Sequence, residues 1–176
     1  MMAVLEIVKY PATVLLQRAE EVREVDGALQ KQIDKMIETL YAAPGLGLAA
    51  PQVGDSRRFF VYDLSVQEEE PVARKGPLVV LNPEILEMEG EEVSDEGCLS
   101  IPGYHEKVKR AYRVLLRGLD RDGKEIRLEG EGLLARLFQH EVDHINGVLM
   151  VDRFSSLKKD IFFRKFKKML KQGESF

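Results

Sequence analysis

The chain has 176 residues, of which 44% are hydrophobic and 32% charged, and this predicts one globular domain, 1–176, with a sizeable core. No run approaches the roughly 18 uninterrupted apolar residues of a membrane helix, and the first residues lack a basic segment followed by an apolar one. We therefore expect a cytoplasmic protein without a membrane partner. The net charge of −4 argues against DNA as a partner, and the single cysteine, Cys98, excludes an intramolecular disulfide.

The first long element that the sequence predicts is an amphipathic helix over 26–43. Apolar residues recur there at intervals of three and four, and Asp26 stands where an N-cap residue is expected. In the following segment, 44–52, two glycines and two prolines among small residues disfavour a regular element, so we expect a loop.

Two short runs of β-branched and aromatic residues, 58–63 and 77–82, predict strands. The connection between them, 65–76, carries three consecutive glutamates as well as basic residues, and is expected to be solvated. We therefore expect two strands joined by a surface loop.

The second half of the chain begins with a predicted hairpin and continues into a helix. Asp122-Gly123 is a strong turn signal, and it lies between the strand-like runs 112–119 and 124–128. A helix is expected over 130–146, with Gly147 as its C-terminal stop.

A last helix is predicted at about 156–171, so the order of elements is helix, strands, helix, helix. Strands that precede helices without strict alternation predict an α+β fold. We expect mixed or antiparallel sheets packed around a central metal-binding helix, with an N-terminal and a C-terminal helix beside them.

The sharpest chemical signal lies in the central predicted helix, between His140 and His144. Residues four apart lie on one helix face, so both imidazoles can reach one metal ion, and Glu141 then stands beside it as a group that exchanges protons. Cys98 can supply a third ligand and leave a fourth position open, as in catalytic metal sites. Taken alone, the motif also fits a solvated helix face and the cysteine a small core residue.

Three segments resemble, in the same order and with similar spacing, the signature motifs of peptide deformylases: 45–52, 96–100 and 140–144. The resemblance covers nearly the whole chain and includes Asn82-Pro83, which it places in a turn. It implies a hydrolase that removes the N-formyl group from the formyl-methionine of nascent polypeptides and releases formate. It also implies iron(II) in the cell, although the ligand types suit zinc, nickel or cobalt in purified protein.

The resemblance assigns the metal-ligand role to the same residues, and the general acid and base role to Glu141. It adds two groups that donate hydrogen bonds to a developing oxyanion, namely the side-chain amide of Gln52 and the backbone N–H of Leu99. Two donors aimed where negative charge appears are a sensible complement to a metal ion.

Other residues are expected to contact the substrate. Glycines let a peptide backbone approach closely, as an added strand does, and leucines can line an apolar slot for methionine, although each leucine is equally well explained as core. The residues expected in these roles are Gly45, Leu46, Gly47, Gly97, Leu133 and Leu137.

Three further positions are expected to support the site or its rim. By the resemblance Arg110 pairs with Glu96 and holds the cysteine segment, although a surface arginine is the alternative. Asp143 is a candidate partner for a metal ligand or for Arg110, and the sequence does not decide between them. His105 stands where some bacterial members carry arginine, and we expect a surface residue beside Glu106.

The C-terminal segment, 155–176, carries seven lysines and arginines and two acidic residues, a net charge of +5. Its apolar spacing predicts an amphipathic helix. A solvated basic face is one interpretation. The resemblance adds another, docking of this helix on ribosomal RNA.

Two rival functions use the same motif. A zinc endopeptidase predicts internal cleavage of unformylated peptides, and Cys98 in place of a downstream ligand disfavours it. A non-catalytic metal-binding or ribosome-binding module predicts that Glu141→Gln changes no activity.

Overall fold

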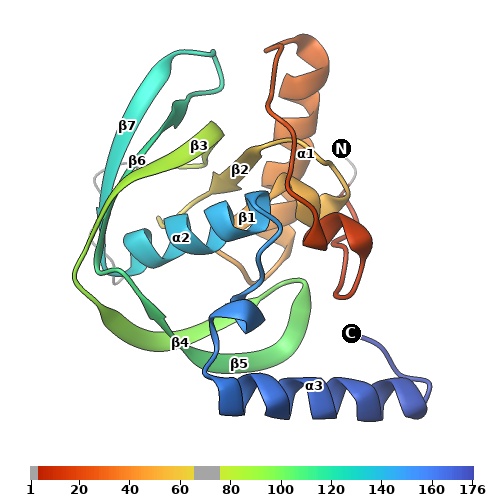
Figure 1. Cartoon of the computed structure of the whole chain (residues 1–176). Helices are drawn as coiled ribbons and strands as arrows, with labels where there is room; N and C mark the ends of the chain where they lie inside the picture. The colour runs from red at the N-terminus through yellow and green to blue at the C-terminus, as the bar shows by residue number, and fades with distance from the viewer. Residues whose placement is uncertain (1–3, 66–75) are drawn as a thin grey trace.

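The computed structural model describes residues 4–65 and 76–176, and it shows an α+β fold built on two antiparallel sheets (Figure 1). The predicted fold class is therefore confirmed. The expected solvated connection, 65–76, lies almost entirely outside the described residues. Among the described helices none is long and apolar enough to cross a membrane.

The larger sheet has the strand order β1-β2-β3-β6-β7, and β4 and β5 form a second, two-stranded sheet. Neighbouring strands pair antiparallel throughout, and the predicted hairpin is confirmed as β6 and β7. The strands are β1 (Gly47–Ala49), β2 (Phe59–Tyr62), β3 (Leu78–Glu89), β4 (Glu92–Cys98), β5 (Ile101–Arg110), β6 (Arg113–Leu119) and β7 (Glu125–Glu131).

Strand β2 is covered on both faces, which explains why all four of its residues are buried. Phe59 and Val61 pack with the apolar side of α1 (Gly27–Ala42), whereas Phe60 and Tyr62 pack with α2 (Leu133–Ile145). Successive side chains of a strand point to opposite faces, so the two helices sandwich this part of the sheet. The predicted first helix is confirmed, including its N-cap, where Asp26 accepts a hydrogen bond from the Leu29 N–H.

Helix α2 occupies the centre of the molecule, with the large sheet on one side and the small β4–β5 sheet below it in Figure 1. It begins later than predicted. Gly130 still pairs with Val114 in the β7–β6 ladder, and Gly132, with a φ of +60°, makes the turn from strand to helix. The predicted stop is confirmed, since Gly147 has a φ of +74° just beyond the helix end.

Two loop predictions were wrong. Segment 44–52 contains β1, whose extended backbone pairs with β2 at the sheet edge, and the first residues of a short 3-10 helix, Ala50–Val53. Asn82-Pro83 lies inside β3 and not at a turn. Asn82 has a φ of +50°, and the pairing of β3 with β6 shifts register between Leu81 and Glu84, so the strand bulges there and continues.

Helix α3 (Ser156–Lys171) has the predicted bounds and lies along the small sheet (Figure 1). Its buried aromatic residues are Phe162 and Phe166, which contact the rings of Tyr10 and, for Phe162, Tyr104. A short 3-10 helix, Met150–Arg153, connects α2 to α3. Another, Thr13–Leu16, lies in the N-terminal segment.

Candidate metal centre

Three metal-binding side chains converge where the small sheet meets the central helix. Cys98 is the last residue of β4, and His140 and His144 lie one turn apart on α2. The Cys98 Sγ is 3.3 Å from the His144 Nε2, which is 3.2 Å from the His140 Nε2. All three donor atoms lie within 4.8 Å of one another.

The spacing and chemistry of these donors fit a metal ion. In a tetrahedral site with bonds of about 2.0 Å to nitrogen and 2.3 Å to sulfur, neighbouring donors are separated by about 3.3–3.6 Å, close to the distances found here. A thiolate with two imidazoles suits zinc and the first-row ions iron, cobalt and nickel. Within 4–65 and 76–176, no second cluster of three His, Cys, Asp or Glu side chains fits an ion.

The electrostatics favour the ionised thiol that a metal requires. Burial opposes ionisation of Cys98, but the positive charge of the His144 ring and hydrogen bonds from both histidines hold the pKa of the thiol well below its usual range. Burial also opposes charge on His140, yet its hydrogen bonds with Cys98 and Glu96 raise the pKa of its imidazole well above the usual value. Metal binding requires a deprotonated thiol and a neutral imidazole, so the lowered pKa of Cys98 favours it and the raised pKa of His140 opposes it.

Glu141 is buried beside the donors, with 4% of its surface exposed, and its Oε2 has no hydrogen-bond partner among the described residues. Burial raises the pKa of this carboxyl, while the positive charges of His140 and His144 partly offset the rise. Strand β1 brings Gly47 against it. A Cβ at Gly47 would lie 2.8 Å from the Glu141 Oε1, so a larger residue there would displace the carboxylate.

Gln52 lines the same cavity as Glu141 and is almost completely buried. Its Oε1 accepts a hydrogen bond from the Ala49 N–H at 3.0 Å, which orients the amide group. Its Nε2 lies 3.2 Å from the Ser100 Oγ and 3.8 Å from the Cys98 Sγ. The amide hydrogens are therefore directed at the cysteine segment. Leu99 follows Cys98 in the turn between β4 and β5.

All six residues expected to contact the substrate line one cavity of about 410 Å³ beside the donors. Glu141 and Gln52 line it as well. Leu46, Leu133 and Leu137 also belong to or pack against the core under α2, so both interpretations of these leucines hold in part. The cavity thus has an apolar wall next to the polar groups.

His105 is exposed, as expected, but it also lines this cavity. It is the cross-strand partner of Gly97, and a Cβ at Gly97 would lie 2.7 Å from the His105 ring. The imidazole therefore lies across the glycine at the rim.

Glu96 links the cysteine strand to a metal ligand. Its Oε1 is 2.7 Å from the His140 Nδ1 and accepts a hydrogen bond from the Arg110 Nη2 at 2.8 Å, and its Oε2 accepts one from the Arg110 Nε. Asp143 contacts Arg110 at 2.6 Å and is not a partner of a ligand. Arg110 is 5% exposed, so the alternative of a surface arginine was wrong. Burial raises the Glu96 pKa, but Arg110 and His140 outweigh it and keep this pKa far below its usual value.

Sequence reasoning missed two arginines of this network. Arg136 donates to the Glu96 Oε2 at 2.6 Å, and Arg153 donates to the Asp143 carboxylate at 2.8 and 3.1 Å. A signal was present for the first of them. Arg136 stands four residues before His140 in an otherwise apolar segment, so it shares the face of the helix that carries the histidines.

Comparisons with known proteins show the family to which this chain is related. The family model described as polypeptide deformylase matches residues 4–160. A peptide deformylase of Thermodesulfovibrio yellowstonii is 53% identical over 166 residues, 94% of this chain and 98% of the relative. A peptide deformylase of Syntrophobacter fumaroxidans is 49% identical over 172 residues, 98% of this chain and 99% of the relative.

Solved structures give the same result. A crystal structure of a peptide deformylase from Legionella pneumophila aligns with a TM-score of 0.84 at 42% identity, over 97% of this chain and 98% of the other. A peptide deformylase from Ehrlichia chaffeensis in complex with actinonin aligns with a TM-score of 0.86 at 39% identity, over 95% of this chain and 98% of the other.

Proposed function

The chain belongs to the polypeptide deformylase family, and we propose that the cavity beside Cys98, His140 and His144 is its active site. The family is metal-dependent and its reaction removes the N-formyl group from nascent polypeptides, so the chain is a hydrolase with that activity. The observation that supports this location is the convergence of three donor atoms with a buried carboxylate, Glu141, in one cavity.

Cys98, His140 and His144 hold one divalent metal ion in this proposal. When bound, the ion supplies Lewis acidity, which makes water a nucleophile near neutral pH and stabilises developing negative charge. The family implies iron(II) in the cell, and the same donors accept zinc, nickel or cobalt in purified protein.

Glu141 moves the protons of the reaction. It takes a proton from the attacking water and delivers it to the nitrogen of the leaving amine, so that formate and a free amino terminus result. Burial raises its pKa, which brings a carboxyl group closer to the value that suits a proton carrier at neutral pH.

Gln52 and the backbone N–H of Leu99 donate hydrogen bonds to the oxyanion. The orientation of the Gln52 amide, fixed by Ala49 and directed towards Cys98, supports this role. Preorganised donors need no reorientation when charge develops, and removing one such donor typically lowers kcat by roughly 10²–10³.

The glycines of the cavity accept the peptide backbone and its leucines accept the methionine side chain. The Leu99 and His105 side chains lie against Gly45 and Gly97, because a Cβ at either glycine would lie within 2.9 Å of them, so a larger residue at either position would displace the cavity lining. Leu46, Leu133 and Leu137 form the apolar wall.

The deciding experiment is formate release from formyl-Met-Ala-Ser by anaerobically prepared, iron- or nickel-loaded protein. We expect release by the parent and a fall of at least roughly 10² in kcat for Glu141→Gln, because general acid and base catalysis contributes on that order. Internal cleavage of an unformylated peptide without formate release would replace this proposal with an endopeptidase. A metal-loaded, folded parent with neither activity would favour a binding module.

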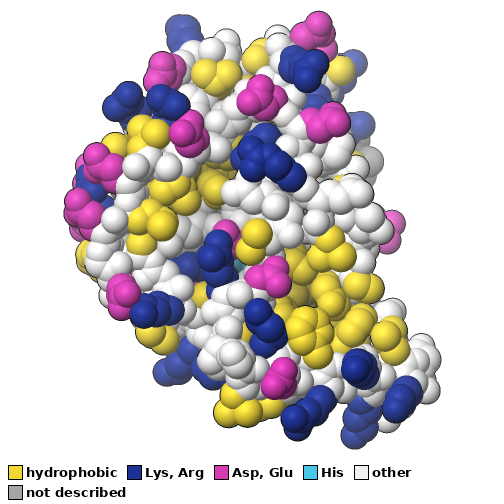
Figure 2. Space-filling model, viewed as in Figure 1, with side chains coloured by type: hydrophobic (Ala, Val, Ile, Leu, Met, Phe, Trp, Pro, Cys, Tyr) yellow, Lys and Arg dark blue, Asp and Glu magenta, His cyan; other side chains and the backbone are white. Residues whose placement is uncertain are grey.

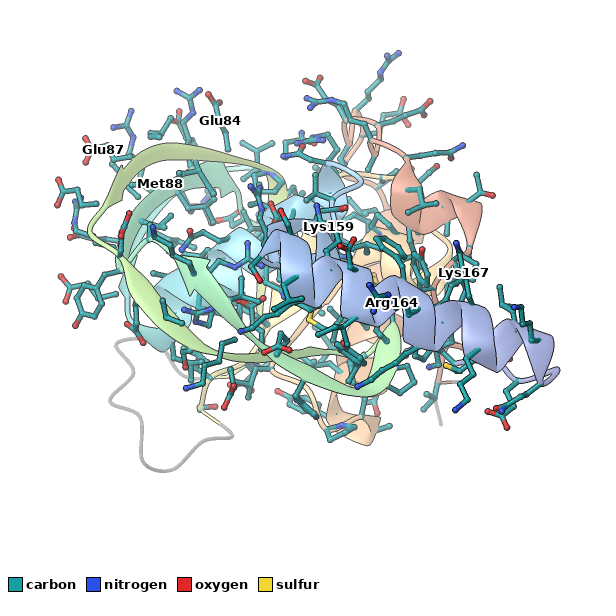
Figure 3. The ribbon with its side chains drawn as sticks, turned by 60° about the horizontal axis from the view of Figure 1, so that its bottom comes forward. Glu84, Glu87, Met88, Lys159, Arg164 and Lys167 are labelled. Atoms are coloured by element: carbon teal, nitrogen blue, oxygen red, sulfur yellow. The ribbon has the colours of Figure 1, made fainter. Side chains whose placement is uncertain are left out.

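The surface of α3 supports the proposal that this protein docks on the ribosome in the cytoplasm. Lys159, Arg164 and Lys167 lie along the helix in Figure 3, and Figure 2 shows lysine and arginine side chains gathered over it. A basic helix binds RNA phosphates through counterion release, so binding should weaken as salt rises. We expect Arg164→Glu with Lys167→Glu to reduce co-sedimentation with ribosomes and leave turnover of a free formyl peptide unchanged. Unchanged co-sedimentation would contradict docking through α3.

A further inference from the structure

We propose that Arg136 is a positioning residue, which fixes the strand that carries Cys98 against the helix that carries His140 and His144 and thereby sets how long the metal is retained. The proposal rests on the metal site proposed above. Strand β4 supplies one donor and helix α2 supplies the other two, so the site is complete only while these two elements stay at a fixed separation.

Arg136 has the position that such a role requires. It lies one turn before His140 on α2, and its side chain is almost fully buried. Its Nη1 donates to the Glu96 Oε2 at 2.6 Å and to the Val108 carbonyl at 2.8 Å, and its Nη2 donates to the Glu92 carbonyl at 2.9 Å. One guanidinium from the helix therefore contacts both strands of the small sheet.

Glu96 carries the effect to the donors. It stands two residues before Cys98 on β4 and contacts the His140 Nδ1 at 2.7 Å through the oxygen that Arg136 does not bind. Each of its oxygens has two hydrogen-bond partners, which uses the roughly four acceptor positions of a carboxylate. The carboxylate is thus held in one orientation. Loss of the Arg136 contact would leave the Oε2 with the Arg110 Nε alone, so the carboxylate would be held only from its own sheet and could shift relative to the His140 imidazole that its Oε1 orients.

Arg110 duplicates this function only in part, because it joins Glu96 on β4 to α2 at Asp143, beside His144, and not at the end of the motif that carries His140. It lies on β5, in the same sheet as Glu96, so its bidentate contact with Glu96 joins two strands that are already paired. It reaches α2 only through Asp143, next to the other end of the metal motif. The apolar face of α2, by contrast, packs on the large sheet. Arg136 is the arginine that ties the helix itself to Glu96.

The test compares Arg136→Met, which keeps an unbranched apolar stem but removes the guanidinium, with Arg136→Lys, which keeps a charge but cannot reproduce the planar fork. Arg121→Met is the matched control, because Arg121 binds Asp34 on the surface, away from the donors. Cobalt-loaded proteins are mixed with an excess of chelator, and metal loss is followed by the thiolate-to-cobalt absorption band. Thermal midpoints of the metal-free proteins and kcat and KM for formyl-Met-Ala-Ser complete the measurements.

For Arg136→Met we expect metal loss up to roughly 10-fold faster than in the parent. Removing a direct partner of a metal ligand, as Glu96 is for His140, typically costs roughly 10–100-fold in metal affinity or activity, and Arg136 acts one contact further out. We expect Arg136→Lys to restore part of the retention, and kcat to fall while KM stays near the parent value. Arg121→Met should match the parent in every measurement.

A lowered thermal midpoint of metal-free Arg136→Met with the parent's rate of metal loss would overturn the proposal and leave Arg136 a purely structural role. If the methionine variant does not fold, a parental rate of metal loss in Arg136→Lys overturns it equally. Failure of the proposed function looks different, since the parent would then show the cobalt–thiolate band and release no formate.

Discussion

Two sets of ion pairs in this molecule have overlapping contact distances and opposite surroundings. The Arg136–Glu96 pair beside the metal centre and the Arg113–Glu129 pair on the large sheet both have nitrogen–oxygen distances of 2.6 Å. The Glu96 side chain is 6% exposed, whereas that of Glu129 is 55% exposed. The contact distance therefore does not distinguish the two pairs, whereas the exposed fraction of the carboxylate does. We expect the buried pair to contribute more to the free energy of unfolding.

The two sets of ion pairs differ in what can solvate the remaining charge when one partner is removed. On the outer face of β3, β6 and β7, water can solvate a carboxylate or guanidinium whose partner is removed, and salt screens the attraction. Figure 3 shows Glu84 and Glu87 on this face pointing away from the body of the molecule. In the interior around Glu96, removal of one partner leaves an uncompensated buried charge. The two sets thus provide matched substitutions that test this contrast.

The largest effect is expected for Glu96→Gln. The variant keeps the size of the side chain but removes the negative charge between Arg110 and Arg136, both of which are about 5% exposed. Breaking a buried pair in this way typically costs about 3–5 kcal/mol of unfolding free energy. Urea denaturation of the metal-free protein measures it. A loss below about 1 kcal/mol, which is typical of exposed pairs, would show that the buried pair contributes no more to stability than an exposed one.

A smaller loss is expected for Asp143→Asn. Arg110 keeps its bidentate contact with Glu96, and the side chain of Arg153 is 49% exposed, so water can replace part of its lost partner. Hydrogen bonds to charged groups contribute about 1.5–3 kcal/mol, and we expect a loss in that range by the same denaturation measurement. A loss equal to that of Glu96→Gln would contradict this prediction. It would mean that the exposure of Arg153 to water does not reduce the cost of losing its partner.

Acid should weaken the buried network progressively. Because the folded-state pKa of Glu96 is lowered, its stabilising contribution is complete above the unfolded value of about 4.3 and is lost as the pH falls through the folded value. On the acid side, the difference in unfolding free energy between the parent and Glu96→Gln should therefore begin to shrink below about pH 5. Urea titrations of both metal-free proteins at several acidic pH values measure this difference. A difference that instead grows as the pH falls below about 5 would contradict the assigned direction.

The sequence predicted the periodic elements well and failed where pairing outside the segment decides the structure. The helices α1 and α3 follow from apolar spacing and local caps, as Asp26 shows. Strand β1 was predicted as a loop because its small residues carry no strand signal, and its extended form depends on pairing with β2. Gly130 was wrongly predicted to begin α2. Its position in strand β7 depends on pairing with Val114, which lies 16 positions earlier and gives no signal in the local sequence.

The same distinction applies to the candidate site. The spacing of His140 and His144 places two donors on one helix face without any knowledge of the fold. Cys98 was inferred from the residues as the third donor, and the resemblance supplied Gln52. Arg136 was missed because its partner, Glu96, comes within reach only when β4 packs against α2. Arg153 was missed because its contact with Asp143 depends on how the short helix Met150–Arg153 folds back towards α2. A charged residue within an apolar helical segment was the signal that could have found Arg136.

The smallest effect is expected for Glu129→Gln, the exposed counterpart of Glu96→Gln. Arg113 lowers the Glu129 pKa by hydrogen bonding and charge, but Arg113 also contacts Glu87 and Glu89, which retain their charges in the variant. The remaining carboxylates and water compensate the arginine, and at about 1 M salt, where the Debye length is about 3 Å, the variant and parent should unfold at the same urea concentration. Formate release should not change, because this pair lies on the outer face of the sheet, away from the cavity. If Glu129→Gln destabilised the protein as much as Glu96→Gln and remained insensitive to salt, exposure would not be the property that separates the two sets of ion pairs.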